Sequence, residues 1–327
     1  MLLYSTYEFL NLPFDPSFLV ESENLIVTQL SKNLEIGKEF SIMIKIGFVD
    51  RYLDNWHTNH YPEYIELAAE LYGMKARVTH AYAEMDTPDE YGLTTKAWCE
   101  HYNCISCTSY EELIESVDAI MVMCADDCLP HEKLAGKALM SGKPVYCDKT
   151  FAPDAAAAGR MFDLAERYHT PVFSCSAQRF CMELLSYKRM EPGLPDFCAA
   201  TGPGDMVNYS IHQYEMLQMI MGNGAKRCQA FLAGETAHIL YQYDNGRMCT
   251  FTQGNKLPFR LVASTKSEGV KDIAVTDYYM NFMNKLLHFF QDKKVPVTRE
   301  DTMEIMAMQQ AGRKAMEHPG IWMDING

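Results

Sequence analysis

The chain has 327 residues, about twice the usual single-domain length, which favours two domains or one large α/β unit. Hydrophobic residues make up 48% and charged residues 22%, so the chain can bury a core, and a collagen, a coiled coil or a disulfide miniprotein is excluded. Acidic residues number 43 against 29 basic ones. This excess opposes binding to nucleic acid or to an anionic membrane surface.

The sequence contains no pattern typical of export or of membrane insertion. The longest clear apolar run, at 119–125, is far shorter than the roughly 20 residues that span a bilayer. Acidic residues interrupt the N-terminal stretch, where a signal peptide needs an apolar core. Eleven cysteines without regular spacing fit reduced thiols. We therefore expect a soluble, cytoplasmic protein.

The first 42 residues differ in character from the rest of the chain. They contain Pro13, Pro16 and a short amphipathic stretch at 18–34, whereas the run at 43–50 is typical of the first strand of an α/β domain. Because such domains often begin close to their first strand, we favour Met43 as the native start and residues 1–42 as an upstream extension. The alternative is an accessory arm packed on the domain.

From Met43 onwards, short apolar runs alternate with helical periods, which is typical of a doubly wound parallel sheet. Strands are predicted at 43–49, 77–83, 117–124, 144–147 and 172–175. Helices are predicted at 61–72, 94–101, 153–168, after a capping box at 109–112, and from Pro130 to just before Gly142. The pattern predicts one domain over residues 43–180.

The rhythm changes after about residue 180. Strand-like runs occur at 197–200, 227–233, 238–243, 248–252, 260–265 and 271–275, with Asn245 and Gly246 as a hairpin turn. Two helices, at 277–291 and 299–317, close the chain. We therefore predict an α+β domain over residues 181–327 with a mostly antiparallel open sheet.

Polar loops follow the predicted strands of the first domain. They span 50–57, 84–86, 125–128 and 148–150. Open parallel sheets bind ligands at the carboxyl ends of their strands, so these loops are the expected site.

The stretch 117–152 resembles the Gfo/Idh/MocA family of NAD(P)-dependent oxidoreductases. In that family a strand, a His-bearing helix, a Gly-Lys turn and a Glu-Lys-Pro motif follow in this order, and here they correspond to His131, Gly142-Lys143 and Asp148-Lys149-Thr150. The segment 208–215 resembles the family's Asp-x-x-x-His-x-x-Asp segment, and 282–325 resembles its closing segment. The resemblance covers residues 43–325.

The resemblance implies a Rossmann-like domain and an enzyme of carbohydrate metabolism that moves hydride to or from a hydroxyl carbon of a sugar, polyol or inositol-like substrate. Lys149 would position and polarise the hydroxyl, and His212 would take its proton, which suits a side chain that titrates near neutrality. Asn208 and Glu215 stand at the acidic positions of the family's segment. Arg179 is a candidate for contacting substrate, with a salt bridge as the alternative. Relatives also suggest a homo-oligomer.

The resemblance further implies a dinucleotide site. Its candidate residues are Gly47, Phe48, Val49, Asp50, Glu84, Ala125, Asp126, His131, Asp148 and Lys149. Glu84, at the end of the second strand, matches the acidic residue that accepts the ribose 2′-hydroxyl and disfavours a 2′-phosphate. This match favours NAD over NADP.

The cofactor loop departs from the family's pattern. The fingerprint Gly-x-Gly-x-x-Gly lets the backbone approach a pyrophosphate, and only Gly47 remains of it. A longer polar loop would have to substitute through Asn55, His57, Thr58 and Asn59. Asp126 and Asp127 replace part of a Thr-Pro-Asn motif, and their carboxylates suit ribose hydroxyls but repel phosphate.

The catalytic motif also departs from the family's pattern. Thr150 replaces a proline that in the family commonly follows a cis peptide bond. A non-proline cis bond costs about 2.5–4 kcal/mol, which leaves Lys149 open to another orientation.

Two spacings resemble metal sites. Cys104 and Cys107 have the spacing of zinc ligands but lack a second pair, so we interpret them as reduced structural thiols. His57 and His60 would supply half of a site, but contact with solvent or ligand is favoured. No metal is therefore expected.

The altered motifs leave a second hypothesis, a non-catalytic descendant of the family that binds a ligand or a partner. The retained Lys149, His212 and Glu215 favour the enzyme.

Overall fold

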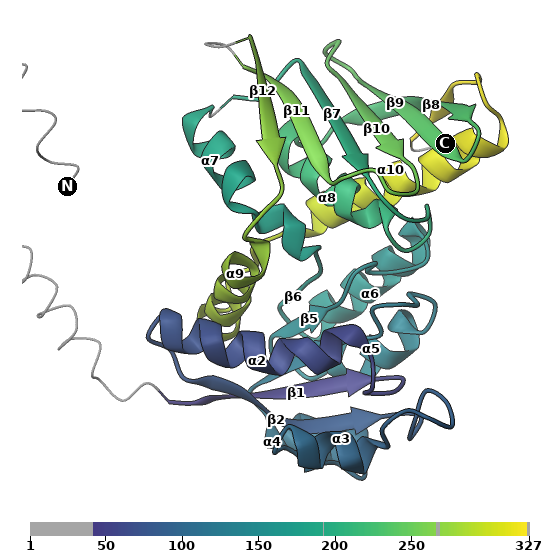
Figure 1. Cartoon of the computed structure of the whole chain (residues 1–327). Coiled ribbons are helices and arrows are strands. Elements are labelled where there is room, and N and C mark those ends of the chain that lie inside the picture. Colours follow the sequence, from purple (N-terminus) through teal and green to yellow (C-terminus); the bar gives the residue numbers. More distant parts are fainter. Residues whose placement is uncertain (1–41, 192, 266–268, 326–327) are drawn as a thin grey trace, which may run out of the picture. The chain divides into compact units, whose positions relative to one another are not determined.

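The computed structural model describes residues 42–191, 193–265 and 269–325 (Figure 1). Apart from Ile42, the predicted extension at residues 1–42 lies outside these ranges. No helix in the described ranges is both long and apolar enough to span a membrane.

The first sheet is parallel and six-stranded. Its strands are β1 (Ile44–Asp50), β2 (Ala76–Ala83), β3 (Ile105–Ser106), β4 (Ala119–Val122), β5 (Val145–Cys147) and β6 (Val172–Phe173), in the order β3-β2-β1-β4-β5-β6. The order reverses between β1 and β4, which is the switch point where open α/β sheets bind ligands. The predicted doubly wound, Rossmann-like sheet is confirmed.

Helices cover both faces of this sheet. They are α2 (Trp56–Leu71), α3 (Thr95–His101), α4 (Tyr110–Ser116), α5 (His131–Leu139), α6 (Ala155–Arg167) and, later in the chain, α9 (Tyr278–Asp292). Alternate side chains of β1 explain the two layers: Phe48 joins the core formed with α2, α3 and α9, and Val49 joins the core formed with α4, α5 and α6. In Figure 1, α2 and α9 lie side by side.

Helix α2 begins five residues earlier than the sequence predicted. The side chain of Asn55 accepts a hydrogen bond from the Thr58 amide, and the Thr58 hydroxyl accepts one from the Asn55 amide. This reciprocal cap stabilises a helix start at Trp56, even though Pro62 stands inside the helix. The expected loop at 50–57 is therefore shorter, and His57 to Asn59 belong to a helix.

The second sheet has seven strands and is mixed. They are β7 (Phe197–Gly202), β8 (Ala225–Ala233), β9 (Thr236–Tyr243), β10 (Met248–Gln253), β11 (Arg260–Thr265), β12 (Gly269–Ala274) and β13 (Met323–Asp324), in the order β12-β11-β7-β10-β9-β8-β13. Only the β7–β10 pair among these strands is parallel, so the predicted, mostly antiparallel sheet is confirmed. Gly246, at φ +81°, forms the predicted hairpin turn between β9 and β10.

Four helical segments pack between or beside the sheets. They are the 3₁₀ turn η1 (Ala177–Phe180), α7 (Met182–Met190), α8 (Ser210–Met221) and α10 (Arg299–Glu317). Helices α8 and α10 pack on one face of the second sheet and bury its core. The boundary proposed at residue 180 falls between η1 and α7, and we keep it as a proposal.

Candidate functional site

A cavity of about 270 Å³ lies where the carboxyl ends of β4, β5 and β6 meet α2, α8 and α9. Its polar wall residues are His57, Asp126, Lys149, Ser176, Gln178, Asn208 and His212. Its aromatic wall residues are Trp56, Tyr61, Tyr209, Phe259, Tyr278 and Tyr279. Concave sites of this mixed composition, with a few polar groups among aromatic ones, are typical of small-molecule binding.

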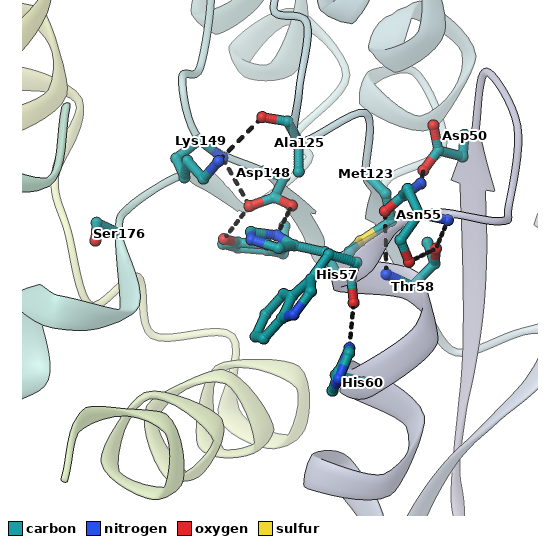
Figure 2. A network of polar contacts seen from close by, with 12 residues as sticks. Asp50, Asn55, His57, Thr58, His60, Met123, Ala125, Asp148, Lys149 and Ser176 are labelled. Atoms are coloured by element: carbon teal, nitrogen blue, oxygen red, sulfur yellow. Dashed lines mark hydrogen bonds and ion pairs between the residues drawn. The ribbon is translucent and has the colours of Figure 1, made fainter. Parts of the chain in front are cut away.

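Lys149 reaches this cavity from the end of β5. The residue is 9% exposed, and Nζ donates a hydrogen bond of 3.0 Å to the carbonyl of Ala125 (Figure 2). The peptide bond between Lys149 and Thr150 is cis. An ammonium with one carbonyl partner retains two N–H donors for other groups.

Asp148, the residue before Lys149, is fully buried and is hydrogen-bonded to His57. The Nδ1 atom of His57 lies 2.5 Å from Oδ2 of Asp148, while Oδ1 accepts hydrogen bonds from the Tyr146 hydroxyl at 3.0 Å and the Lys149 amide at 2.8 Å. Burial alone would raise the pKa of Asp148, but His57 and Lys149 lower it to about 2. Asp148 is therefore ionised at neutral pH.

His212 enters the cavity from the first turn of α8. Its Nδ1 atom lies 2.6 Å from the Ser176 hydroxyl, and its ring meets the edge of Phe259. Burial lowers the pKa of His212 to about 3, and the charges of Lys149 and His57 act in the same direction. His212 is therefore neutral at physiological pH.

The three other predicted catalytic or substrate residues differ in their access to the cavity. Asn208 is exposed and lines it. Glu215 and Arg179 are buried outside its wall, where they form an ion pair of 2.9 Å, and Arg179 also donates to Gln218. Burial raises the pKa of Glu215 to about 7, although Arg179 opposes this shift. This ion pair joins η1 to α8 behind the cavity.

The predicted cofactor residues of β1 have their side chains in the core. Phe48 and Val49 are fully buried. A Cβ atom on Gly47 would lie 2.8 Å from the Leu113 side chain, so the packing of α4 against β1 requires a glycine here. These three residues can therefore approach a ligand only through their backbone.

The turn between β1 and α2 encloses a second, much smaller cavity of about 20 Å³. Its wall includes the acidic residues Asp50, Asp126 and Asp127 together with Arg51, whose Nη1 lies 3.7 Å from Asp127. Asp50 is buried and accepts a 2.9 Å hydrogen bond from Asn55. Burial raises the pKa of Asp50 to about 7.

The side chains expected to replace the glycine fingerprint already have partners within the protein. Asn55 and Thr58 cap α2, and His57 pairs with Asp148. Asn59 donates to Asp54 at 2.8 Å and accepts from Trp98 at 2.8 Å. Because Asp126 and Asp127 offset the one guanidinium of Arg51 and the Asp50 carboxyl is buried behind them, the turn does not fit a pyrophosphate held in the family's manner.

The remaining cofactor candidates lie at other strand ends. Glu84 forms a 2.8 Å ion pair with Lys133 and is about a third exposed, so its carboxylate can still accept ribose hydroxyls. Asp126 lines both cavities, and Ala125 lines the smaller one. His131 is fully buried between two backbone carbonyls, at 2.7 and 3.1 Å, and lines neither cavity.

The two sequence spacings that resemble metal sites are Cys104 with Cys107 and His57 with His60. Among the described residues, no group of three or more His, Cys, Asp or Glu side chains is placed to bind a metal ion. Cys104 and Cys107 are free thiols, and His60 stacks on Trp56 with ring centroids 4.2 Å apart.

Sequence reasoning missed the His57–Asp148 pair and the aromatic wall. The two partners of the pair are 91 residues apart, and Tyr278 and Tyr279 come from the start of a helix in the last sixth of the chain. The polar character of both strand ends was the only available signal.

Residues 77–175 match the model of a family described as the oxidoreductase family with an NAD-binding Rossmann fold. This match confirms the family resemblance seen at 117–152. A comparison with curated protein sequences finds no match.

Several solved structures share the fold. A probable dehydrogenase from Thermotoga maritima has 15% identity and a TM-score of 0.70, with 86% of this chain and 99% of that chain covered. A UDP-N-acetylglucosamine 3-dehydrogenase from Acidithiobacillus ferrooxidans has 14% identity and a TM-score of 0.68, with coverage of 84% and 98%. A scyllo-inositol dehydrogenase from Lactobacillus casei, solved with NAD(H) and scyllo-inositol, has 12% identity and a TM-score of 0.69, with coverage of 88% and 100%.

Proposed function

We propose that this chain, whose residues 77–175 match the model of the Gfo/Idh/MocA oxidoreductases, transfers hydride between a nicotinamide cofactor and a hydroxyl-bearing carbon of a sugar, polyol or inositol-like substrate. The observation that carries the proposal is the 270 Å³ cavity, in which Lys149 from the first sheet and His212 from α8 share one wall. The dehydrogenases that share the fold support the same class of reaction.

The composition of the cavity wall supports a polyhydroxylated substrate. Trp56 is 45% exposed, and its ring lines the cavity together with those of Tyr278 and Tyr279. Aromatic faces pack against the C–H groups of a sugar or inositol ring, while Lys149, Asn208 and Gln178 supply polar contacts for hydroxyl groups.

Within this reaction, Lys149 would stabilise the alkoxide that develops as a hydroxyl loses its proton. A buried ammonium does this effectively because little water screens its charge. His212 is a weak base in this environment, so its role would be that of a neutral hydrogen-bond partner. Another group on the cavity wall would therefore accept the proton of the substrate hydroxyl.

The cofactor would supply the hydride acceptor or donor. Glu84 supports NAD over NADP, because a carboxylate accepts ribose hydroxyls and repels a 2′-phosphate. The acidic turn between β1 and α2 opposes this part of the proposal. It favours a second candidate, a polyol-binding module of the same fold that takes no free dinucleotide.

Titration of the purified full-length chain with NAD⁺, NADH, NADP⁺ and NADPH separates the two candidates. Calorimetry should show saturable binding of one oxidised and reduced pair, with NAD(H) preferred. Absence of heat with all four nucleotides, in protein shown by mass spectrometry to carry no bound nucleotide, would favour the binding module.

Assembly and location complete the proposal. Large apolar side chains are exposed on the second sheet, at Phe197, Phe231, Leu232 and Met248, which supports the expected homo-oligomer. Light scattering of the purified chain tests this expectation. The cytoplasmic location stays a prediction.

A further inference from the structure

We infer that His57 is the residue that takes and returns the proton of the substrate hydroxyl, with Asp148 as its positioning partner. The inference rests on the proposed function, because it places that hydroxyl in the cavity beside Lys149. It assigns to α2 a catalytic group that the motif at Asn208–Glu215 does not contain.

The hydrogen bond to Asp148 fixes which nitrogen of His57 can act. Because Asp148 is ionised and can only accept hydrogen bonds, the Nδ1 atom of His57, 2.5 Å away, must be the donor. A neutral His57 therefore carries its proton on Nδ1 and leaves the lone pair of Nε2 available. A carboxylate holds an imidazole in one tautomer in the same way in hydrolase triads.

The ring is both held in place and accessible. It stacks on Tyr61 with centroids 4.8 Å apart and an interplanar angle of 23°, and Trp56 meets it edge-on. The side chain is 13% exposed and lines the cavity with Lys149, while Asp148 behind it is fully buried (Figure 2). A solute in the cavity can thus reach His57 but not its partner.

His57 has a carboxylate partner, whereas the hydrogen-bond partner of the His212 ring is a hydroxyl. The titratable groups that line the cavity with His57 are Tyr61, Asp126, Lys149, Tyr209, His212, Tyr278 and Tyr279, while Asp148 contacts His57 and Tyr146 donates to Asp148. The ring of His212 lies beside the Ser176 hydroxyl and the edge of Phe259, and burial lowers its pKa, with the charge of Lys149 acting in the same direction. Of the two imidazoles on the cavity wall, only His57 contacts a carboxylate that can stabilise the imidazolium formed on proton transfer.

The proton transfer balances without another reactant. The O–H bond of the substrate breaks, its proton forms an N–H bond at Nε2 of His57, and the electron pair stays on oxygen. The resulting imidazolium is paired with Asp148, and the alkoxide lies beside the Lys149 ammonium. In the reverse direction His57 returns the proton.

Turnover of His57→Gln tests the catalytic role. With a polyol and the nucleotide that the wild type uses, we expect kcat to fall about 10²–10⁴-fold while KM changes little. Added imidazole should restore turnover to His57→Ala. His288→Gln, an exposed histidine on α9, is the matched control and should keep wild-type kcat. A loss smaller than threefold in His57→Gln, or no rescue, would overturn the inference.

A second measurement does not depend on turnover. Long-range ¹H–¹⁵N spectra of the full chain labelled at histidine nitrogens report each tautomer, and His57→Gln identifies the signals. We expect neutral His57 to carry its proton on Nδ1 and to lose this preference in Asp148→Asn; a proton on Nε2 in the wild type would overturn the inference. If the wild type turns over no polyol, the proposed hydride transfer is wrong. The tautomer of His57 then still tests whether Asp148 holds the proton of His57 on Nδ1.

Discussion

Two polar regions lie at the same edge of the parallel sheet and differ in how completely their side chains pair with one another. At the turn between β1 and α2, Asp50, Asn55, Thr58 and Asn59 all have partners within the protein, and only about 20 Å³ remains open. At the ends of β5 and β6, the cavity measures about 270 Å³, and Lys149 reaches it with N–H donors to spare. Polar groups that already bond one another have little left for a ligand, so chemistry is expected in the second region.

The largest expected effect comes from removing the cation of the cavity. Lys149→Ala should lower kcat for polyol oxidation about 10²–10³-fold, because no other ammonium lines this wall among the described residues to stabilise an alkoxide. Steady-state kinetics measures the loss, and thermal unfolding checks that the variant is folded. Lys285→Ala, at an exposed lysine of α9, is the control. Equal kcat in Lys149→Ala and Lys285→Ala would contradict the assignment of the chemistry to the 270 Å³ cavity.

A smaller effect is expected on stability at the turn. Burial raises the pKa of Asp50 from 3.8 to about 7, so between these values the unfolded chain loses its proton before the folded chain does. The free energy of unfolding therefore falls as pH rises through this window. Asp50→Asn should remove this fall and gain about 1–3 kcal/mol relative to the wild type between pH 4 and pH 8.

Urea unfolding at the two pH values measures the Asp50 effect. Asp196→Asn, at an exposed carboxylate before β7, should follow the wild type. If the free energy of unfolding changes equally with pH in Asp50→Asn and in the wild type, burial does not hold the Asp50 carboxyl protonated. The turn would then be more accessible to water than the structure shows.

The smallest effect concerns the carboxylate that the two regions share. Asp126 lines both cavities, and an exposed charge near a phosphate changes binding by about 1 kcal/mol. Asp126→Asn should therefore raise the affinity for NAD⁺ up to about fivefold, more at low salt than at high salt. Calorimetry at two ionic strengths measures the change; weaker binding by the variant would show that Asp126 accepts ribose hydroxyls instead.

The fold could be predicted because its signals are local. Alternating apolar runs and helix caps marked most strands and helices, and α10 was predicted at residues 299–317, where the structure has it after the capping residue Thr298. The start of α2 was missed because its cap pairs Asn55 with Thr58 instead of the usual Ser or Thr with Glu or Gln. Short elements such as η1 and β13 carry too few residues for a periodic signal.

The site could be predicted only in part, because it depends on contacts between distant segments. Lys149 and His212 were expected to lie together, and both line the cavity. The buried pairing of Glu215 with Arg179, which takes both side chains out of the cavity wall, has no signal in the local sequence. The same holds for His57 and Asp148, whose pairing requires the packing of α2 beside the end of β5.

The most direct test of the proposed reaction is the formation of reduced nicotinamide by the wild-type chain. NAD⁺ or NADP⁺ would be supplied with scyllo-inositol, myo-inositol and simple sugars in turn, and the absorbance of the reduced cofactor followed beside Lys149→Ala. We predict turnover with at least one polyol, faster with NAD⁺, and its near-complete loss in the variant. No reduction with any combination, or equal reduction by wild type and variant, would contradict hydride transfer in this cavity.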